Sequence, residues 1–150
     1  MGSTPAESTV HDAEPHAIRV LLVEDNADAA QLARSQICSG SRHNQFQVEW
    51  KDNLQQAMIR LAKPDIDVVL LDLGMPELSG HRAHLAITSV VGTAIPVVIL
   101  TSDDSAISRN LTIRQGAVGY LVKRQTSPFK LRQALHEAVV LTKRLKVRSL

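Results

Sequence analysis

Residues 68–80 read VVLLDLGMPELSG, a run of four apolar residues followed by Asp72 and by a turn that contains Gly74 and Pro76. An uninterrupted apolar run of this length, bounded by turn-forming residues, predicts a short β-strand that is covered on both faces. Such strands are typical of parallel sheets, in which ligands bind beyond the carboxyl ends of the strands. Asp72 stands at one of these ends, so we expect it to face a ligand site.

The alternation of strand and helix continues in both directions from this run. Segments of strand length occupy residues 18–23, 46–50, 68–71, 95–100 and 118–122. Segments with helical spacing of apolar residues lie near 27–38, 54–61, 81–91, 105–115 and 127–145. Asn26, Asn53 and Ser127 are suited to begin three of these helices, and Pro64 and Gly116 to end two of them. The strict alternation predicts an α/β protein with a parallel sheet that helices cover on both sides.

Polar residues follow four of the five strands. Glu24 and Asp25 follow the first strand, Asp72 the third, Thr101 the fourth and Lys123 the fifth. Three converging carboxylates repel one another unless a cation joins them, and their hard oxygen ligands suit Mg²⁺. A phosphoryl group could then be held by the metal, Lys123 and the Thr101 hydroxyl. A carboxylate that faces the phosphorus is a competent nucleophile, and Asp72 is the natural candidate.

Each of these residues also has an ordinary structural explanation. A lone aspartate after a strand is often a turn former or a helix cap, a lone threonine is often an N-cap, and a lone lysine usually lies on the surface. Their convergence at one edge of the sheet favours a site that accepts a phosphoryl group.

Four stretches of the chain resemble the receiver domain of bacterial two-component response regulators, the flavodoxin-like family of the chemotaxis regulator. They are VLLVEDN at 20–26, VVLLDLGMPELSG at 68–80, VVILTSD at 97–103 and GYLVK at 119–123. The stretches occur in the family's order and spacing, and the resemblance covers about residues 18–145. It implies a doubly wound (βα)5 fold with a five-stranded parallel sheet in the strand order 2-1-3-4-5.

The resemblance also implies roles for individual residues. Asp72 matches the phosphoacceptor aspartate of the family. Glu24 and Asp25 match its acidic pair, of which the second residue ligates Mg²⁺ directly. Gly74 matches the position whose backbone carbonyl completes the protein ligands of the metal. Lys123 matches the lysine that forms ion pairs with the phosphoryl group and the aspartate.

Two further matches concern the residues that change conformation when members of the family are phosphorylated. Thr101 matches the hydroxyl that turns towards the phosphoryl group, and Tyr120 matches the aromatic residue that changes rotamer with it.

The family usually has aspartate in place of Glu24 and often a polar residue in place of Gly74. Arg124 replaces the proline that usually follows the lysine, so we expect a differently shaped loop but the same chemistry.

These matches imply a signalling protein that is controlled by phosphorylation. A histidine kinase or a phosphotransfer protein would transfer a phosphoryl group to Asp72 with Mg²⁺. The new charge would reshape the surface of the fourth helix, the fifth strand and the fifth helix, and this surface would signal to a partner or an output domain. No enzymatic activity is implied beyond self-catalysed phosphorylation and dephosphorylation. The alternative is a receiver-like binding module that works without phosphorylation.

Two enzyme or cofactor-binding classes with related folds fit poorly. A phosphatase of the haloacid dehalogenase type needs a second aspartate two residues after the first, and this position is Gly74. A flavodoxin holds phosphate in a loop rich in serine, threonine and glycine, whereas residues 24–26 are acidic and would repel it.

Length and composition limit the remaining possibilities. The 150 residues are 44% apolar and 21% charged, which is typical of one soluble globular domain. We expect a disordered arm over residues 1–16, the receiver domain over 17–146 and a short basic tail over 147–150. No apolar run approaches the roughly 20 residues that span a bilayer, the arm has no secretory segment, and Cys38 has no cysteine partner. We therefore expect a cytoplasmic protein, either a stand-alone receiver or a fragment of a longer regulator.

The distribution of charge raises the question of partners. Residues 123–150 contain eight of the seventeen basic residues and a single acidic one. The few aromatic residues and the lack of a recognition motif favour a solvated helix over direct nucleic-acid binding. His81 and His84 have no acidic or cysteine partner for a metal site, so we expect them to face solvent. A homodimer through the fourth and fifth helices is plausible by analogy with the family.

Overall fold

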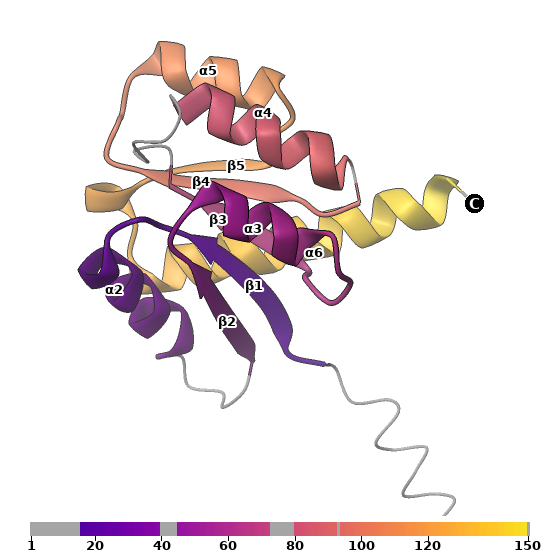
Figure 1. Cartoon of the computed structure of the whole chain (residues 1–150), viewed down its shortest axis with the longest axis horizontal. Helices are drawn as coiled ribbons and strands as arrows, with labels where there is room; N and C mark the ends of the chain where they lie inside the picture. Colours follow the sequence, from indigo (N-terminus) through magenta and orange to yellow (C-terminus); the bar gives the residue numbers. More distant parts are fainter. Residues whose placement is uncertain (1–15, 40–44, 73–79, 93, 150) are drawn as a thin grey trace, which may run out of the picture.

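The computed structural model describes residues 16–39, 45–72, 80–92 and 94–149. Its centre is a five-stranded parallel sheet in the order β2-β1-β3-β4-β5, which confirms the expected fold and strand order (Figure 1). The strands are β1 (Ile18–Val23), β2 (Phe46–Lys51), β3 (Val68–Leu71), β4 (Val97–Thr101) and β5 (Gly119–Val122). The helices are α2 (Ala27–Cys38), α3 (Leu54–Leu61), α4 (Gly80–Val91), α5 (Ala106–Arg114) and α6 (Pro128–Ser149), with a 3-10 turn η1 (Lys123–Gln125) before α6.

Helices cover both faces of the sheet (Figure 1). On one face α2 and α6 pack against strand residues such as Leu22, Leu70 and Val98. On the other face α3 and α4 pack against strand residues such as Leu71 and Ile99, and α5 lies beside α4 over β5. Successive strand residues point to opposite faces, so residues 20–23 of β1, all of β3 and residues 97–100 of β4 are apolar and fill both layers.

Side-chain caps begin the helices where the sequence predicts them. The side-chain oxygens of Asn26 and Asn53 accept hydrogen bonds from backbone N–H groups in the first turns of α2 and α3, both at 2.8 Å. Ser127 accepts one from the first turn of α6 at 3.1 Å. Gly116 follows α5 with a φ of 105°, the left-handed conformation that favours glycine after a helix.

Several boundaries differ from the expected ones. β4 begins at Val97 and not at residue 95, because Pro96 has no N–H to donate to the ladder; its carbonyl accepts from the N–H of Val69. The sequence did not predict the turn η1. The helix α6 continues through Ser149, past residue 145, where we expected the helix to end.

His84 does not face solvent as expected. Its side chain is fully buried in α4, on the same stripe as Ala83 and Ile87, and its Nδ1 lies 3.3 Å from Oε1 of Gln115 beyond the end of α5. The helical spacing from His84 to Ile87 and Val91 was the available signal for burial. The side chain of His81, residues 1–15 of the arm expected over residues 1–16, and the turn that contains Gly74 lie outside the described residues.

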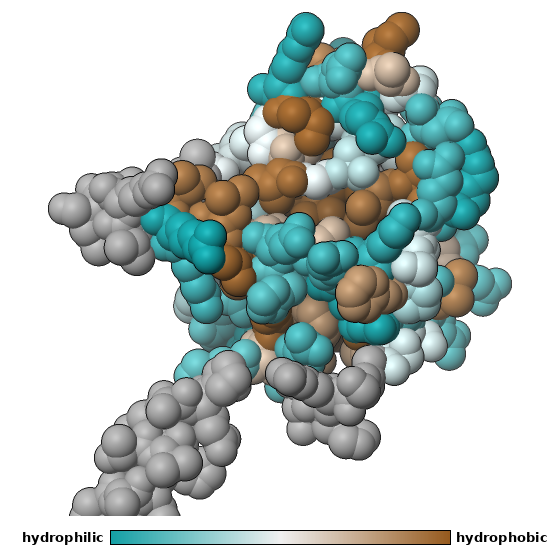
Figure 2. Space-filling model, turned by 180° about the vertical axis from the view of Figure 1, so that it is seen from behind, coloured by the Kyte–Doolittle hydropathy of each residue, from teal (hydrophilic) through white to brown (hydrophobic). Residues whose placement is uncertain are grey.

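The surface on the side of α6 carries both apolar and charged side chains (Figure 2). Val118 and Leu141 are exposed and line a groove of about 570 Å³ between β5 and α6. None of the helices described has both the length and the apolar character needed to cross a bilayer.

Candidate functional site

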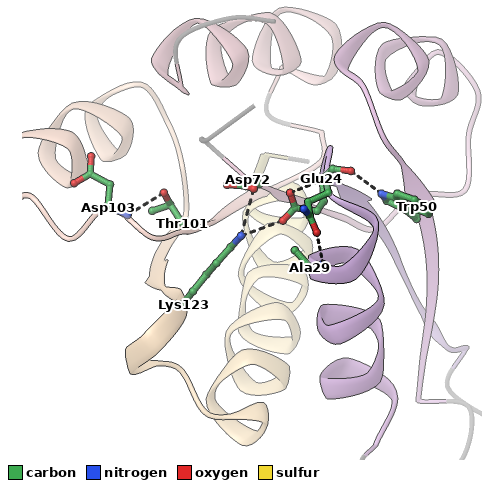
Figure 3. Close-up of polar contacts among 8 residues, drawn as sticks. Glu24, Ala29, Trp50, Asp72, Thr101, Asp103 and Lys123 are labelled. Carbon is green, nitrogen blue, oxygen red and sulfur yellow. Dashed lines mark hydrogen bonds and ion pairs between the residues drawn. The ribbon is translucent and has the colours of Figure 1, made fainter. Parts of the chain in front are cut away.

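The site lies at the carboxyl edge of the sheet, where β1, β3, β4 and β5 end. Glu24 and Asp25 directly follow β1, Asp72 directly follows β3, and Lys123 directly follows β5. Parallel strands bring these ends to one edge, and Figure 3 shows Glu24, Asp72 and Lys123 converging there. The structure therefore brings together the four charged residues that the sequence predicts for the site.

Three carboxylates form a compact acidic cluster. Oxygen atoms of Glu24, Asp25 and Asp72 all lie within 4.8 Å of one another. Glu24 and Asp72 are buried, whereas Asp25 is exposed. Carboxylate oxygens at this spacing, with one ligand open to water, fit a hard divalent cation such as Mg²⁺. Gly74, the expected source of a backbone ligand, lies outside the described residues.

Lys123 partly neutralises this cluster. Its Nζ lies 3.1 Å from Oε1 of Glu24 and 3.3 Å from Oδ2 of Asp72, so one ammonium group bridges two buried carboxylates. Burial by itself would lower the pKa of Lys123. The hydrogen bond to Glu24 and the charges of Asp72 and Glu24 outweigh burial and raise this pKa above its usual value. The lysine is therefore held in its charged form.

Glu24 has an unusual protonation equilibrium. Burial, and then hydrogen bonding and repulsion from Asp72, raise its pKa from 4.5 to about 7, although Lys123 opposes the shift. The carboxyl group of Glu24 is thus only partly ionised near neutral pH in the absence of a cation. The cluster holds more negative charge than one lysine can offset, which favours the uptake of a cation.

One contact within the acidic turn and one from β2 hold this turn in place. The backbone N–H of Asn26 donates to Oε2 of Glu24 at 3.3 Å. The indole Nε1 of Trp50, in β2, donates to the backbone carbonyl of Glu24 at 2.7 Å (Figure 3). The sequence predicts a strand over residues 46–50, which includes Trp50, but does not predict this contact. The available signal was its position near the end of β2, the strand that pairs with β1.

The two expected switch residues meet at the backbone of Asp103. Thr101 is buried at the end of β4, and its Oγ1 accepts a hydrogen bond from the Asp103 N–H at 3.2 Å. Tyr120 is buried in β5, and its hydroxyl donates to the Asp103 carbonyl at 2.7 Å and lies 3.2 Å from Oγ of Ser108. Both hydroxyls therefore contact the segment that leads into α5.

Arg124 also contacts this segment. Its Nη1 donates to the carbonyl of Ser102 at 3.3 Å, and its Nη2 forms an ion pair with Asp104. The chain after β5 turns through η1, and Oγ1 of Thr126 donates to the carbonyl of Val122 at 2.8 Å. The loop thus has a defined conformation without the proline, and its arginine connects it to the segment before α5.

A family model described as the response regulator receiver domain matches residues 20–136. The chain is 29% identical over 127 residues to the response regulator MprA of Mycolicibacterium vanbaalenii, which covers 85% of the chain and 51% of MprA. It is 34% identical over 122 residues to the autoinducer 2 sensor kinase/phosphatase LuxQ of Vibrio cholerae, covering 81% of the chain and 13% of LuxQ. The chain therefore spans about half the length of MprA and a small part of LuxQ.

The fold agrees with these matches. The crystal structure of a response regulator receiver domain protein from Clostridium thermocellum superposes with a TM-score of 0.73 and 23% identity. The superposition covers 85% of this chain and 98% of that structure. At 23% sequence identity, this structural similarity shows only that the two proteins share a fold.

Proposed function

The chain belongs to the response regulator receiver domain family, and we propose that it works as a signalling switch in which Asp72 accepts a phosphoryl group. One observation carries the proposal: the ammonium group of Lys123 bridges Asp72 and Glu24 within a cluster of three carboxylates. Core packing does not require such an arrangement, and burying these charges is costly. A phosphoryl group and a cation would interact with each of these charged side chains.

The proposed reaction is a phosphoryl transfer from a phosphohistidine of a kinase or a phosphotransfer protein. An oxygen of the Asp72 carboxylate attacks the phosphorus, and the P–N bond of the donor breaks. The electron pair stays on the imidazole nitrogen, and Asp72 becomes an acyl phosphate. Attack of water on this acyl phosphate returns the carboxylate and releases inorganic phosphate, and we propose no enzymatic activity beyond these two steps.

The residues of this chain would perform two tasks in the transfer. Glu24, Asp25 and Asp72 would hold Mg²⁺, which supplies charge neutralisation for the phosphoryl oxygens when it is bound. Lys123 already contacts Oδ2 of Asp72, so its ammonium group is placed to pair with an oxygen of the group that Asp72 receives. Its raised pKa keeps this charge available throughout the physiological range.

We propose that the switch acts through Asp103. If the Thr101 hydroxyl turns to donate to the phosphoryl group, it leaves the backbone N–H of Asp103, which it now contacts. Tyr120 holds the carbonyl of the same residue, so a change at Thr101 alters the support of the segment before α5. The surface formed by α5, β5 and α6 carries exposed Ile107, Val118 and Leu141. Exposed apolar groups of this kind suit a protein partner.

The test is intact-mass spectrometry after incubation with acetyl phosphate and Mg²⁺. We expect one phosphoryl adduct on the native protein, no adduct without the metal and none on Asp72→Asn. Asp52→Asn is the matched control, because Asp52 is an exposed aspartate that follows β2 and lies outside the acidic cluster. This control should still form the adduct. An unmodified native protein under all of these conditions would contradict the proposal and favour a binding module that works without phosphorylation.

A further inference from the structure

Trp50 is the single tryptophan of the chain, and its side chain reaches from β2 to the acidic turn after β1. In the β1–β2 register it lies opposite Leu22, and its indole extends to Glu24, two residues further along. The backbone N–H of Glu24 pairs with the carbonyl of Lys51 at 3.1 Å, while the Glu24 carbonyl accepts the indole N–H at 2.7 Å. Both backbone groups of this buried residue are therefore held by β2.

The carbonyl that Trp50 holds belongs to the peptide bond between Glu24 and Asp25. Because a peptide unit is planar, fixing its carbonyl also restricts the direction in which Asp25 leaves the turn. This restriction matters because Asp25, Glu24 and Asp72 repel one another. Asp25 is the exposed member of the three, so it has the most room to move outwards.

We infer that Trp50 is a positioning residue for the metal: its indole N–H holds the peptide between Glu24 and Asp25 so that Asp25 stays directed at the acidic cluster. The inference rests on the proposed function, since it assumes that the cluster binds a divalent cation. The ring of Trp50 also packs against the core next to Leu22 and Val48, so a merely structural role is the competing explanation.

The decisive variants remove the N–H and keep an aromatic ring. Trp50→Phe is the first. The second exploits the single tryptophan of the chain: biosynthetic replacement by 3-benzothienylalanine puts sulfur in place of the N–H and preserves the bicyclic shape. Free Mn²⁺, the probe ion, is measured by electron paramagnetic resonance during a titration, and Mg²⁺ is then added as a competitor. We expect both proteins to bind Mn²⁺ about three- to tenfold more weakly than the native chain, because one hydrogen bond that orders the site is lost.

Val48→Ala is the matched control, because Val48 lies on the same strand and the same face as Trp50 and packs against the same core. Thermal unfolding without metal reports the stability of all four proteins. Weaker Mn²⁺ binding in the two Trp50 proteins, with unchanged binding in Val48→Ala, supports the inference. Native affinity in the benzothienylalanine protein, or an equal loss in Val48→Ala, overturns it and leaves the proposed function standing. A native chain that binds neither Mn²⁺ nor Mg²⁺ overturns both.

Discussion

At the scale of single residues, the acidic edge changes the ordinary chemistry of Glu24. This carboxyl group is buried next to Asp72, and one lysine cannot compensate for two buried carboxylates. A folded-state pKa of about 7 means that the folded protein retains a proton that the unfolded chain releases near pH 4.5. Ionisation of Glu24 therefore works against folding unless a cation is present.

The first prediction follows from this shift. Glu24→Gln carries no charge at any pH, so it lacks the loss of stability that the native chain undergoes as Glu24 ionises. In EDTA, the free energy of unfolding of the native chain should fall by about 2 kcal/mol relative to the variant between pH 5 and pH 8. Urea denaturation at several pH values measures this difference. Parallel pH profiles for the two proteins would contradict the raised pKa, and Mg²⁺ should reduce the difference at pH 8.

At the scale of elements, several side chains support the segment that leads into α5. Tyr120 and Thr101 contact the backbone of Asp103, Arg124 contacts its two neighbours, and Ser105 caps the helix through the N–H of Ser108. The guanidinium carbon of Arg109 also lies 5.3 Å from the centre of the Tyr120 ring. The position of α5 therefore depends on side chains from β4, β5 and η1.

The second prediction concerns the Tyr120 hydroxyl. Tyr120→Phe retains the buried ring but leaves the carbonyl of Asp103 without this donor. We expect a loss of about 1 kcal/mol in the free energy of unfolding and faster hydrogen exchange in α5. Ser108→Ala, which removes only the longer contact to the hydroxyl, should cost less. Native stability and exchange in Tyr120→Phe would show that this hydroxyl does not anchor α5.

The third prediction separates stability from local order at Arg124. The ion pair with Asp104 is exposed on both sides, so Arg124→Ala should change the free energy of unfolding by less than about 0.5 kcal/mol. Amide hydrogen exchange at residues 102–105 should nevertheless become faster, because the segment loses a contact to η1. Lys130→Ala, another exposed basic residue, is the control and should leave this exchange unchanged. Unaltered hydrogen exchange in Arg124→Ala would mean that the other contacts are sufficient to order residues 102–105.

At the scale of the whole molecule, stability resides in the two apolar layers on either side of the sheet. α6 contributes Leu131, Leu135 and Val139 to one layer over its first turns. Leu141 of the same helix is exposed, whereas its neighbour Thr142 is buried. The helix thus has two parts, a buried face that belongs to the core and an exposed face.

The fourth prediction compares these two parts of α6. Leu135→Ala should lower the free energy of unfolding by about 2–5 kcal/mol, because Leu135 is fully buried and its removal leaves a cavity. Leu141→Ala, the same substitution at a position that is 47% exposed, should change it by less than about 1 kcal/mol. Urea denaturation measures both values. Equal losses at the two positions would show that Leu141 is also part of the core.

Local patterns in the sequence predicted the alternating strands and helices and the parallel sheet, whereas the strand order was implied only by the resemblance to the receiver family. The apolar runs, the caps at Asn26, Asn53 and Ser127, and the left-handed Gly116 predict the elements and their order, because these features depend on neighbours in the chain. The convergence of the residues that follow the strands can be predicted for a related reason. Once the strands are parallel, their ends must meet at one edge, so Glu24, Asp25, Asp72 and Lys123 converge.

Only the tertiary structure decided which side chains meet across long separations in the chain. The hydrogen bond from Trp50 to Glu24, the pairing of Arg124 with Asp104 and the contact of His84 with Gln115 each join segments at least 20 residues apart. No periodic pattern encodes them, because each depends on the packing of two elements and on a particular side-chain rotamer. The raised pKa of Glu24 has the same origin, since burial and the distance to Asp72 exist only in the folded chain.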